Sequence, residues 1–182
     1  MRILYVIGKH ITFPGAFLRA FWEQVTCLLL GLSVENTGYL RADEMCGHIE
    51  HVLPKKASAA YISATAPGVM SLIAGLPLTI FGIINLRVLG VAPADSVLLF
   101  VIYILVLYAG VSVMCCLHPQ FEVAQNLWDI TLEKLRSKDT KSKVGGIFMF
   151  LPALCTYIGA ILERFSVPVI VWAVGITLIF VL

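Results

Sequence analysis

Charged residues are scarce in this chain. They make up 13% of its 182 residues, whereas hydrophobic residues make up 59%. A typical soluble domain is about 25% charged and about 45–50% apolar. The shortage of charge therefore argues against an ordinary soluble domain and favours an integral membrane protein. The formal net charge of +2, with no basic stripe carrying interleaved aromatic residues, also argues against a nucleic-acid partner.

Several sequence motifs of enzymes are missing as well. The chain has no GxGxxG or Walker loop for a nucleotide and no GxSxG elbow for a nucleophilic serine. No Cys-x-x-Cys pair occurs among Cys27, Cys46, Cys115, Cys116 and Cys155, which we expect to be free structural thiols. The later apolar stretches contain no membrane-embedded carboxylate, which weakens the case for an ion transporter. We therefore assign no catalytic residue, no cofactor and no small-molecule substrate.

What the chain does contain is a series of apolar stretches. They cover residues 16–32, 66–86, 95–117, 145–162 and 167–182. A backbone in lipid must satisfy its own hydrogen bonds, and continuous apolar runs of this length do so as helices. The sequence therefore predicts an all-α, polytopic integral membrane protein with about four to five transmembrane helices. These helices are expected to form one domain over residues 1–182.

Three local patterns refine these predicted spans. Asp95 or Ser96 is well placed to cap the third helix at its N-terminus. The stretch "ASAAYISATA" precedes Pro67, and we expect it to form a separate turn of small residues. Only "ERFS" separates the last two stretches, and such a short connection predicts an antiparallel helical hairpin.

Residues 119–136 predict an amphipathic helix. Its apolar positions recur at helical spacing, at Phe121, Ala124, Leu127, Trp128, Leu132 and Leu135. Two interpretations stay open: the helix lies at the membrane interface or on a partner, with Trp128 as a contact, or it packs on the loops of its own chain. The following "SKDTKSK" is expected to be a solvated linker.

The histidines offer weak candidates for a metal site. His48 and His51 lie three residues apart in "CGHIEH", and on a helix they would share a face. His118 follows the third apolar stretch and is also a candidate ligand. No further ligand follows at a typical spacing, so a polar loop or a short strand pair at the membrane surface is the simpler interpretation.

The first apolar stretch carries two charged residues. Arg19 and Glu23 are four residues apart on one helix face, and Trp22 lies between them. Charges within a membrane segment are costly, so they need partners or a function. One interpretation is an interfacial helix whose charged face touches water. The other is a buried pair, or contacts with the polar groups of a partner or a lipid phosphate.

The stretch "TFPGAFLRAFWEQVTCLLLGLSVENTGYLR" resembles the opening of small membrane zinc metallopeptidases of the site-2 protease type. In that family a Phe-Pro-Gly lead runs into HExxH, in which two histidines hold zinc and the glutamate is the general base. Downstream, "GHIEHVLPK", "SATAPGVMSLIAGLPL" and "HPQFEVAQNLW" are similar to later parts of the pattern. The resemblance covers roughly residues 12–128.

At the positions of the zinc ligands and the catalytic glutamate, this chain departs from the family. Arg19 stands at the first histidine, Ala20 at the catalytic glutamate and Glu23 at the second histidine. Val123 stands where the family's downstream aspartate ligand is expected. A protonated arginine cannot bind zinc, and an alanine transfers no proton. The resemblance therefore implies a pseudo-peptidase that kept the scaffold and lost the metal.

These observations predict a non-catalytic accessory or scaffold subunit of a larger membrane complex. Energy-transducing, respiratory-chain-type assemblies of organelles contain small chains of this kind, which suggests a mitochondrial inner membrane. Other subunits and membrane lipids, including a bound phospholipid, would then be its partners. Two alternatives stay open: an active zinc peptidase that uses His48, His51 or His118 as substitute ligands, and a small transporter or lipid-binding protein.

Overall fold

The protein is represented by a computed structural model that describes residues 2–39 and 47–181. Within these residues the chain is mostly helical, as predicted, with a two-stranded hairpin between its second and third helices. The elements, in chain order, are α1 (Arg2–Ile11), α2 (Phe13–Leu30), β1 (Val34–Gly38), β2 (His48–His51), α3 (Ala57–Ile83), the π-helix η1 (Ile84–Val88), α4 (Val97–Met114), α5 (Phe121–Arg136), α6 (Thr140–Arg164) and α7 (Val167–Val181).

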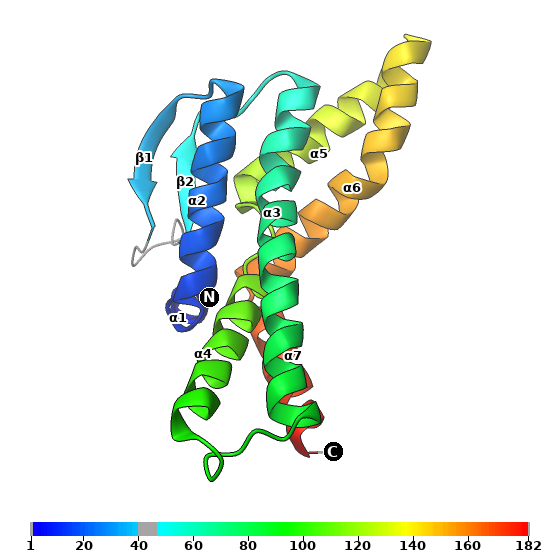
Figure 1. Ribbon diagram of the computed structural model, residues 1–182. Helices are drawn as coiled ribbons and strands as arrows, with labels where there is room; N and C mark the ends of the chain where they lie inside the picture. The colour runs from blue at the N-terminus through cyan, green and yellow to red at the C-terminus, as the bar shows by residue number, and fades with distance from the viewer. Residues whose placement is uncertain (1, 40–46, 182) are drawn as a thin grey trace.

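The long helix α3 forms the axis of the molecule (Figure 1). Helix α2 lies beside the first half of α3, and α4 lies beside its second half. Glycines allow this close packing: a Cβ on Gly82 would lie 2.7 Å from the Cβ of Leu107. Gly15 of α2 likewise leaves no room for a Cβ against the backbone of Ser112. Small residues thus bring the backbones of three helices into contact, as they do in membrane proteins.

Helix α3 is longer than the sequence predicts. Residues 57–66 form its first turns, so the prediction of a separate turn is wrong. Pro67 and Pro77 lie inside the helix, where each lacks the N–H that would bond the carbonyl four residues earlier. Neighbouring helices allow such proline residues to persist in apolar helices. The helix then passes into the π-helical turn η1, in which the buried Asn85 side chain donates to the carbonyl of Phe81.

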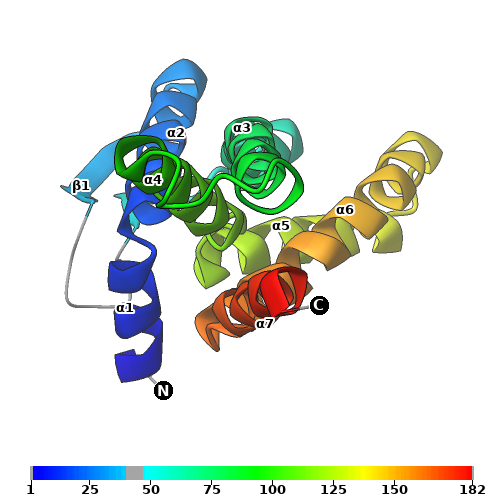
Figure 2. The ribbon, with the colours of Figure 1, turned by 60° about the horizontal axis from the view of Figure 1, so that its bottom comes forward.

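The last two helices also differ from expectation. Helix α6 begins within the predicted linker, because the Asp139 side chain caps its first turn by accepting from the N–H of Ser142 at 3.1 Å. After α6 the chain turns away into α7 instead of running back along it, so the predicted antiparallel hairpin is wrong (Figures 1 and 2). Ser166, with a φ of 56°, makes this corner in the left-handed conformation.

Helix α5 packs on its own chain. Val123 and Leu127 are buried in a cluster with Ala60 and Ala64 of α3 and Ala153 of α6. The ring of Trp128 stacks on that of Tyr157 and also meets that of Phe150. Of the two interpretations of residues 119–136, the structure therefore shows the second, with helices rather than loops as the covering elements.

Within the part of the chain that the structure describes, three helices are long and apolar enough to cross a membrane: Ala57–Val88, Val97–Met114 and Thr140–Arg164. Of the two residues predicted as the N-terminal cap of the second of these, Asp95 and Ser96, the cap is Ser96, whose side chain accepts from the N–H of Leu99. Helix α7 is equally apolar but shorter. Helix α2, which covers the predicted span at residues 16–32, does not qualify by hydropathy because it contains charged side chains.

The surface of the described chain carries many large apolar side chains, and a few charged side chains are buried. Large apolar side chains lie outside, including Ile3, Ile7, Ile11, Phe13, Phe17 and Phe21 in rows along α1 and α2. Most charged side chains of the described residues are exposed, but Lys9, Arg19, Glu23 and Glu163 are buried and lie near one another where α1, α2, α4 and α6 converge. This interior charge cluster is the candidate functional site.

Candidate functional site

The inward face of α2 carries the charge pair that stands out in the sequence. Pro14 lies in the first turn, and Gly31 ends the helix in the left-handed conformation with a φ of 65°. Between these ends, the side chains of Arg19 and Glu23 are 0% and 1% exposed. The interpretation in which they face water is therefore wrong. The burial matters because a charge removed from water needs compensating partners.

Arg19 reaches across to the connection between α4 and α5. Its Nη1 donates to the carbonyl oxygen of Leu117 at 3.0 Å, 98 residues later in the chain. Its Nη2 lies 3.9 Å from Oε1 of Glu23. Gly68 of α3 packs beside the guanidinium group, and a Cβ at this glycine would lie only 3.2 Å from Nη1 of Arg19. Arg19 thus joins α2, α3 and the end of α4 through a single side chain.

Glu23 has partners from the hairpin as well as from its own helix. Its Oε2 accepts the backbone N–H of Ile49 at 2.8 Å and lies 3.4 Å from Nδ1 of His48. Burial lowers the pKa of His48 below its ordinary value, although the attraction of the Glu23 carboxylate opposes this change. The permanent cation that pairs with Glu23 is therefore Arg19.

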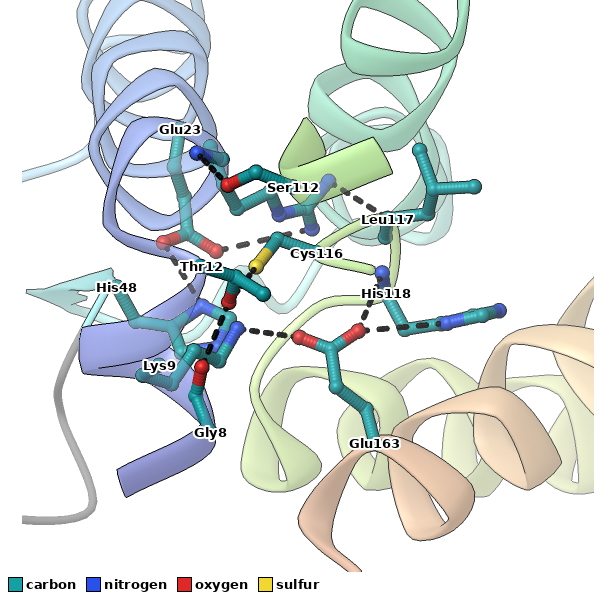
Figure 3. A network of polar contacts seen from close by, with 12 residues as sticks. Gly8, Lys9, Thr12, Glu23, His48, Ser112, Cys116, Leu117, His118 and Glu163 are labelled. Carbon is teal, nitrogen blue, oxygen red and sulfur yellow. Dashed lines mark hydrogen bonds and ion pairs between the residues drawn. The ribbon is translucent and has the colours of Figure 1, made fainter. Parts of the chain in front are cut away.

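A second buried carboxylate, Glu163, lies near the end of α6. It forms an ion pair with Lys9 of α1, 154 residues away in sequence. Its Oε2 also accepts the backbone N–H of His118 at 3.0 Å and lies 3.4 Å from that residue's Nδ1 (Figure 3). Glu163 and Lys9 are 5% and 3% exposed. This second centre joins the first helix to the sixth.

The two carboxylate centres are neighbours (Figure 3). Thr12 lies between them and donates its hydroxyl to the carbonyl of Gly8 at 2.9 Å, and its Oγ1 lies 3.4 Å from Sγ of Cys116. The permanent cations Arg19 and Lys9 match the two carboxylates, so these four buried charges sum to zero. Mutual compensation of this kind makes burial of the charges tolerable.

The residues at the peptidase-like positions do not fit a zinc ion. Arg19 brings a positive charge to the place of the first histidine, and Ala20 offers no donor atom. Val123, at the place of the aspartate, is buried in the apolar cluster under α5. Among residues 2–39 and 47–181, no three His, Cys, Asp or Glu side chains converge closely enough to hold a metal.

The structure separates the other predicted site residues. His48 faces Glu23, whereas His118 faces Glu163. The Nδ1 of His51 approaches the carbonyl of Val52 at 3.1 Å. Both His48 and His51 lie on strand β2, whose partner is β1 in antiparallel pairing, so the strand-pair interpretation of this segment holds. Within the described chain, the indole N–H of Trp22 is buried without a hydrogen-bond partner.

A cavity of about 660 Å³ adjoins the second centre. It lies between α1, the first turn of α5 and the last turns of α6. The side chains of Tyr5, Phe121, Tyr157, Ile161 and Phe165 line it with apolar and aromatic surface. His48 and Glu163 reach it from the charge cluster, and Glu122 and Arg164 line it with exposed charges. Its size is in the range of small-molecule sites in proteins.

Two residues of the site were not found from the sequence. Glu163 follows directly after an apolar stretch and was assigned to the connecting segment, although its helix runs one residue further. Lys9 belongs to α1, whose isoleucines at positions 3, 7 and 11 mark a helix with Lys9 on another face. The spacing of these isoleucines is the feature of the sequence that could have placed Lys9 on the opposite, inward face of a helix.

No family model, curated protein or solved structure matches this chain.

Proposed function

We propose that this chain is a non-catalytic integral membrane protein that serves as an accessory subunit of a larger membrane complex. The observation that carries this proposal is helix α7. None of its described residues is buried, although the helix is almost wholly apolar. Val169 and Trp172 pack against the buried cluster of Ala16, Cys115 and Cys116, whereas Ile170, Val174 and Leu178 remain largely exposed. This exposed apolar side of the helix suits a contact with another membrane subunit.

The interior charge cluster supports the non-catalytic part of the proposal. In the peptidase resemblance, the motif on the first apolar helix and the later "HPQFEVAQ" element must meet at one metal. Here Arg19 bonds to Leu117, directly before that element, so the two segments do meet. They meet through a guanidinium group and a carbonyl, which form a structural contact and provide no metal ligands. This arrangement is what a pseudo-peptidase would contain.

Membrane insertion is part of the same proposal. Three helices meet the length and hydropathy of a membrane span, and α2 and α7 would be the further membrane helices. The many exposed large apolar side chains along these helices support this placement. An organelle inner membrane, such as the mitochondrial one, with its respiratory-chain-type assemblies, is the setting we propose, because such assemblies contain small accessory chains.

The test is native separation after extraction in a mild detergent. We expect the chain to migrate within a larger complex, and isolation only as a monomer would overturn the subunit proposal. Val174 on α7 is 54% exposed, and Val174→Trp should weaken the association by obstructing the contact. Val101→Trp on α4, at 45% exposure, is the matched control and should remain associated.

The alternative of an active zinc peptidase rests on the approach of His48 to Glu23, which places two potential ligands 3.4 Å apart. It predicts one zinc ion per purified chain, lost in His48→Ala. Elemental analysis of the chain purified without chelators separates the two functions. Stoichiometric zinc that disappears in this variant would replace our proposal with the alternative.

A further inference from the structure

We infer that the cavity between α1, α5 and α6 is a binding site for one phospholipid with a zwitterionic headgroup that carries a primary ammonium, as phosphatidylethanolamine does. This inference deepens the proposed function, because it presupposes that the chain lies in a membrane. It also gives a place to the bound lipid that the composition of the chain suggests.

The walls of the cavity fit an acyl chain. Phe121, Tyr157, Ile161 and Phe165 present apolar and aromatic surface from α5 and α6, and Tyr5 does so from α1. The ring centres of Phe121 and Tyr157 lie 5.6 Å apart, so these residues form one continuous wall. A cavity of about 660 Å³ also exceeds what isolated water molecules need, at about 30 Å³ each.

The cavity is continuous with the surface that faces the lipid in our proposal. Phe165 lines the cavity and is 45% exposed, and the neighbouring Leu162 is 43% exposed. On the other side, Ile3 and Ile7 of α1 are 74% and 50% exposed. The apolar side chains of Phe165 and Leu162 therefore offer a lipid from the surrounding bilayer a route to this site.

The charges that line the cavity specify the headgroup. Arg164 and Glu122 are both exposed, and the structure shows no ion pair for either of them within residues 2–39 and 47–181. The Arg164 guanidinium lies over the Phe121 ring, 5.5 Å from its centre. The third charge, Glu163, is already neutralised by Lys9.

One available cation and one available anion therefore line a cavity whose remaining charges cancel. A phosphate matches Arg164, which binds such groups through paired N–H donors. A primary ammonium matches the carboxylate of Glu122 as a hydrogen-bond donor. A quaternary ammonium has no N–H to donate, and a purely anionic headgroup leaves Glu122 without a partner and repels it.

The direct test is lipid retention by the full chain, purified in mild detergent and offered equimolar phosphatidylethanolamine, phosphatidylcholine and phosphatidylglycerol. Native mass spectrometry counts the lipids that stay bound. We expect one lipid per chain, with phosphatidylethanolamine preferred about tenfold, the ratio that corresponds to one charge-assisted contact of about 1.4 kcal/mol. Equal retention of phosphatidylglycerol by the wild-type chain would overturn the headgroup assignment.

Four variants locate the contacts. Glu122→Gln should remove the preference for phosphatidylethanolamine, and Arg164→Gln should reduce retention of all three lipids about tenfold. Glu133 and Arg136 are also exposed and lie on α5 outside the cavity lining. The control variants Glu133→Gln and Arg136→Gln should therefore retain lipids as the wild type does. A preference that survives Glu122→Gln, or that falls equally in the controls, would contradict the inference.

Filling the cavity provides a second readout. Ile161→Trp should displace the lipid, whereas Ile147→Trp, at an exposed position outside the cavity on the same helix, should not. In the unaltered chain, a phosphatidylethanolamine with a photoreactive acyl chain should label residues 157–165 and α1. Labelling confined to other segments would overturn the proposed site. Because this experiment uses the unaltered chain, it stays decisive even if the Ile161→Trp variant fails to fold. A chain that binds this lipid as a monomer would support the inference while contradicting the subunit proposal.

Discussion

The two buried carboxylates are built alike but are held differently. Glu23 and Glu163 each have one permanent cation, one nearby histidine ring and one backbone N–H donor. The cation of Glu23 comes from the preceding turn of its own helix, in the middle of α2. The cation of Glu163 comes from α1, a short helix at the periphery of the molecule (Figure 2).

This difference concerns access to water. Arg19 is enclosed by α2, α3 and the end of α4, so it cannot leave its carboxylate without disturbing the packing of those helices. Lys9 lies on a ten-residue helix that contacts the start of α2 and, at Gly8, the corner at Ser166, and a movement of α1 alone would expose it. The Glu23 centre is thus part of the helix core, whereas the Glu163 centre fastens a peripheral element to that core.

Removing Glu23 should have the largest effect. Glu23→Ala leaves the fully buried Arg19 without an anion, and breaking a buried pair in this way costs about 3–5 kcal/mol. Arg19→Ala should cost a similar amount, because it leaves the carboxylate without its cation. Thermal unfolding in detergent measures the loss. Glu35→Ala, at an exposed position on β1, is the control and should stay within about 0.5 kcal/mol of the wild type.

Removing Glu163 should cost less and act locally. In Glu163→Ala the ammonium group of Lys9 loses its anion, but α1 can move to hydrate it, so we expect a loss of about 1–3 kcal/mol. Hydrogen exchange should increase in α1 and remain unchanged in the middle of α2. Protection of α1 equal to the wild type would show that the Lys9–Glu163 pair does not fasten this helix.

Acidification should weaken the Glu23 centre through His48. Because burial holds the pKa of His48 below its ordinary value, the unfolded chain binds a proton at a higher pH than the folded chain. Stability should therefore fall as the pH decreases below about 6.5, by up to about 1.4 kcal/mol per pH unit for one proton. His48→Gln should flatten this dependence and His10→Gln, at an exposed position, should not. An unchanged slope in His48→Gln would assign the pH dependence to other groups.

The contact between the two centres should have the smallest effect. Thr12→Val removes the hydrogen bond to Gly8 and the contact with Cys116 while keeping the side-chain shape. A neutral hydrogen bond of this kind contributes about 0.5–1.5 kcal/mol. Thr177→Val is a matched control, because Thr177 makes the same bond to a carbonyl four residues earlier at an exposed position on α7. Equal losses of stability in both variants would mean that burial beside Cys116 does not increase the contribution of this hydrogen bond to stability.

Local patterns in the sequence were informative where the interactions are local. The apolar stretches predicted helices near their observed places, and the cap of α4 was narrowed to Asp95 or Ser96 because a cap depends on neighbouring residues. The spacing of Arg19 and Glu23 placed them on one face for the same reason. Hydropathy averages were less informative for α3 and α6, since small residues, prolines and lysines continued those helices beyond their apolar segments.

The rest of the site depended on contacts between distant segments. Nothing near Lys9 in the sequence points to Glu163, and nothing near Arg19 points to the carbonyl of Leu117. The direction of α7 and the covering of α5 by α6 were equally invisible to periodicity, because both follow from how whole helices pack. The cavity likewise exists only because α1, α5 and α6 meet beside the charge cluster.

The sequence by itself determined the helical class, the apolar exterior and the presence of a charge pair on α2, because each follows from composition or from spacing within one helix. Only the tertiary structure decided that this pair is buried, that a second carboxylate balances a lysine 154 residues away, and that a cavity lies beside them. The physical reason is that a buried charge must be compensated wherever the fold places it, and its partners come from whichever segments packing brings near.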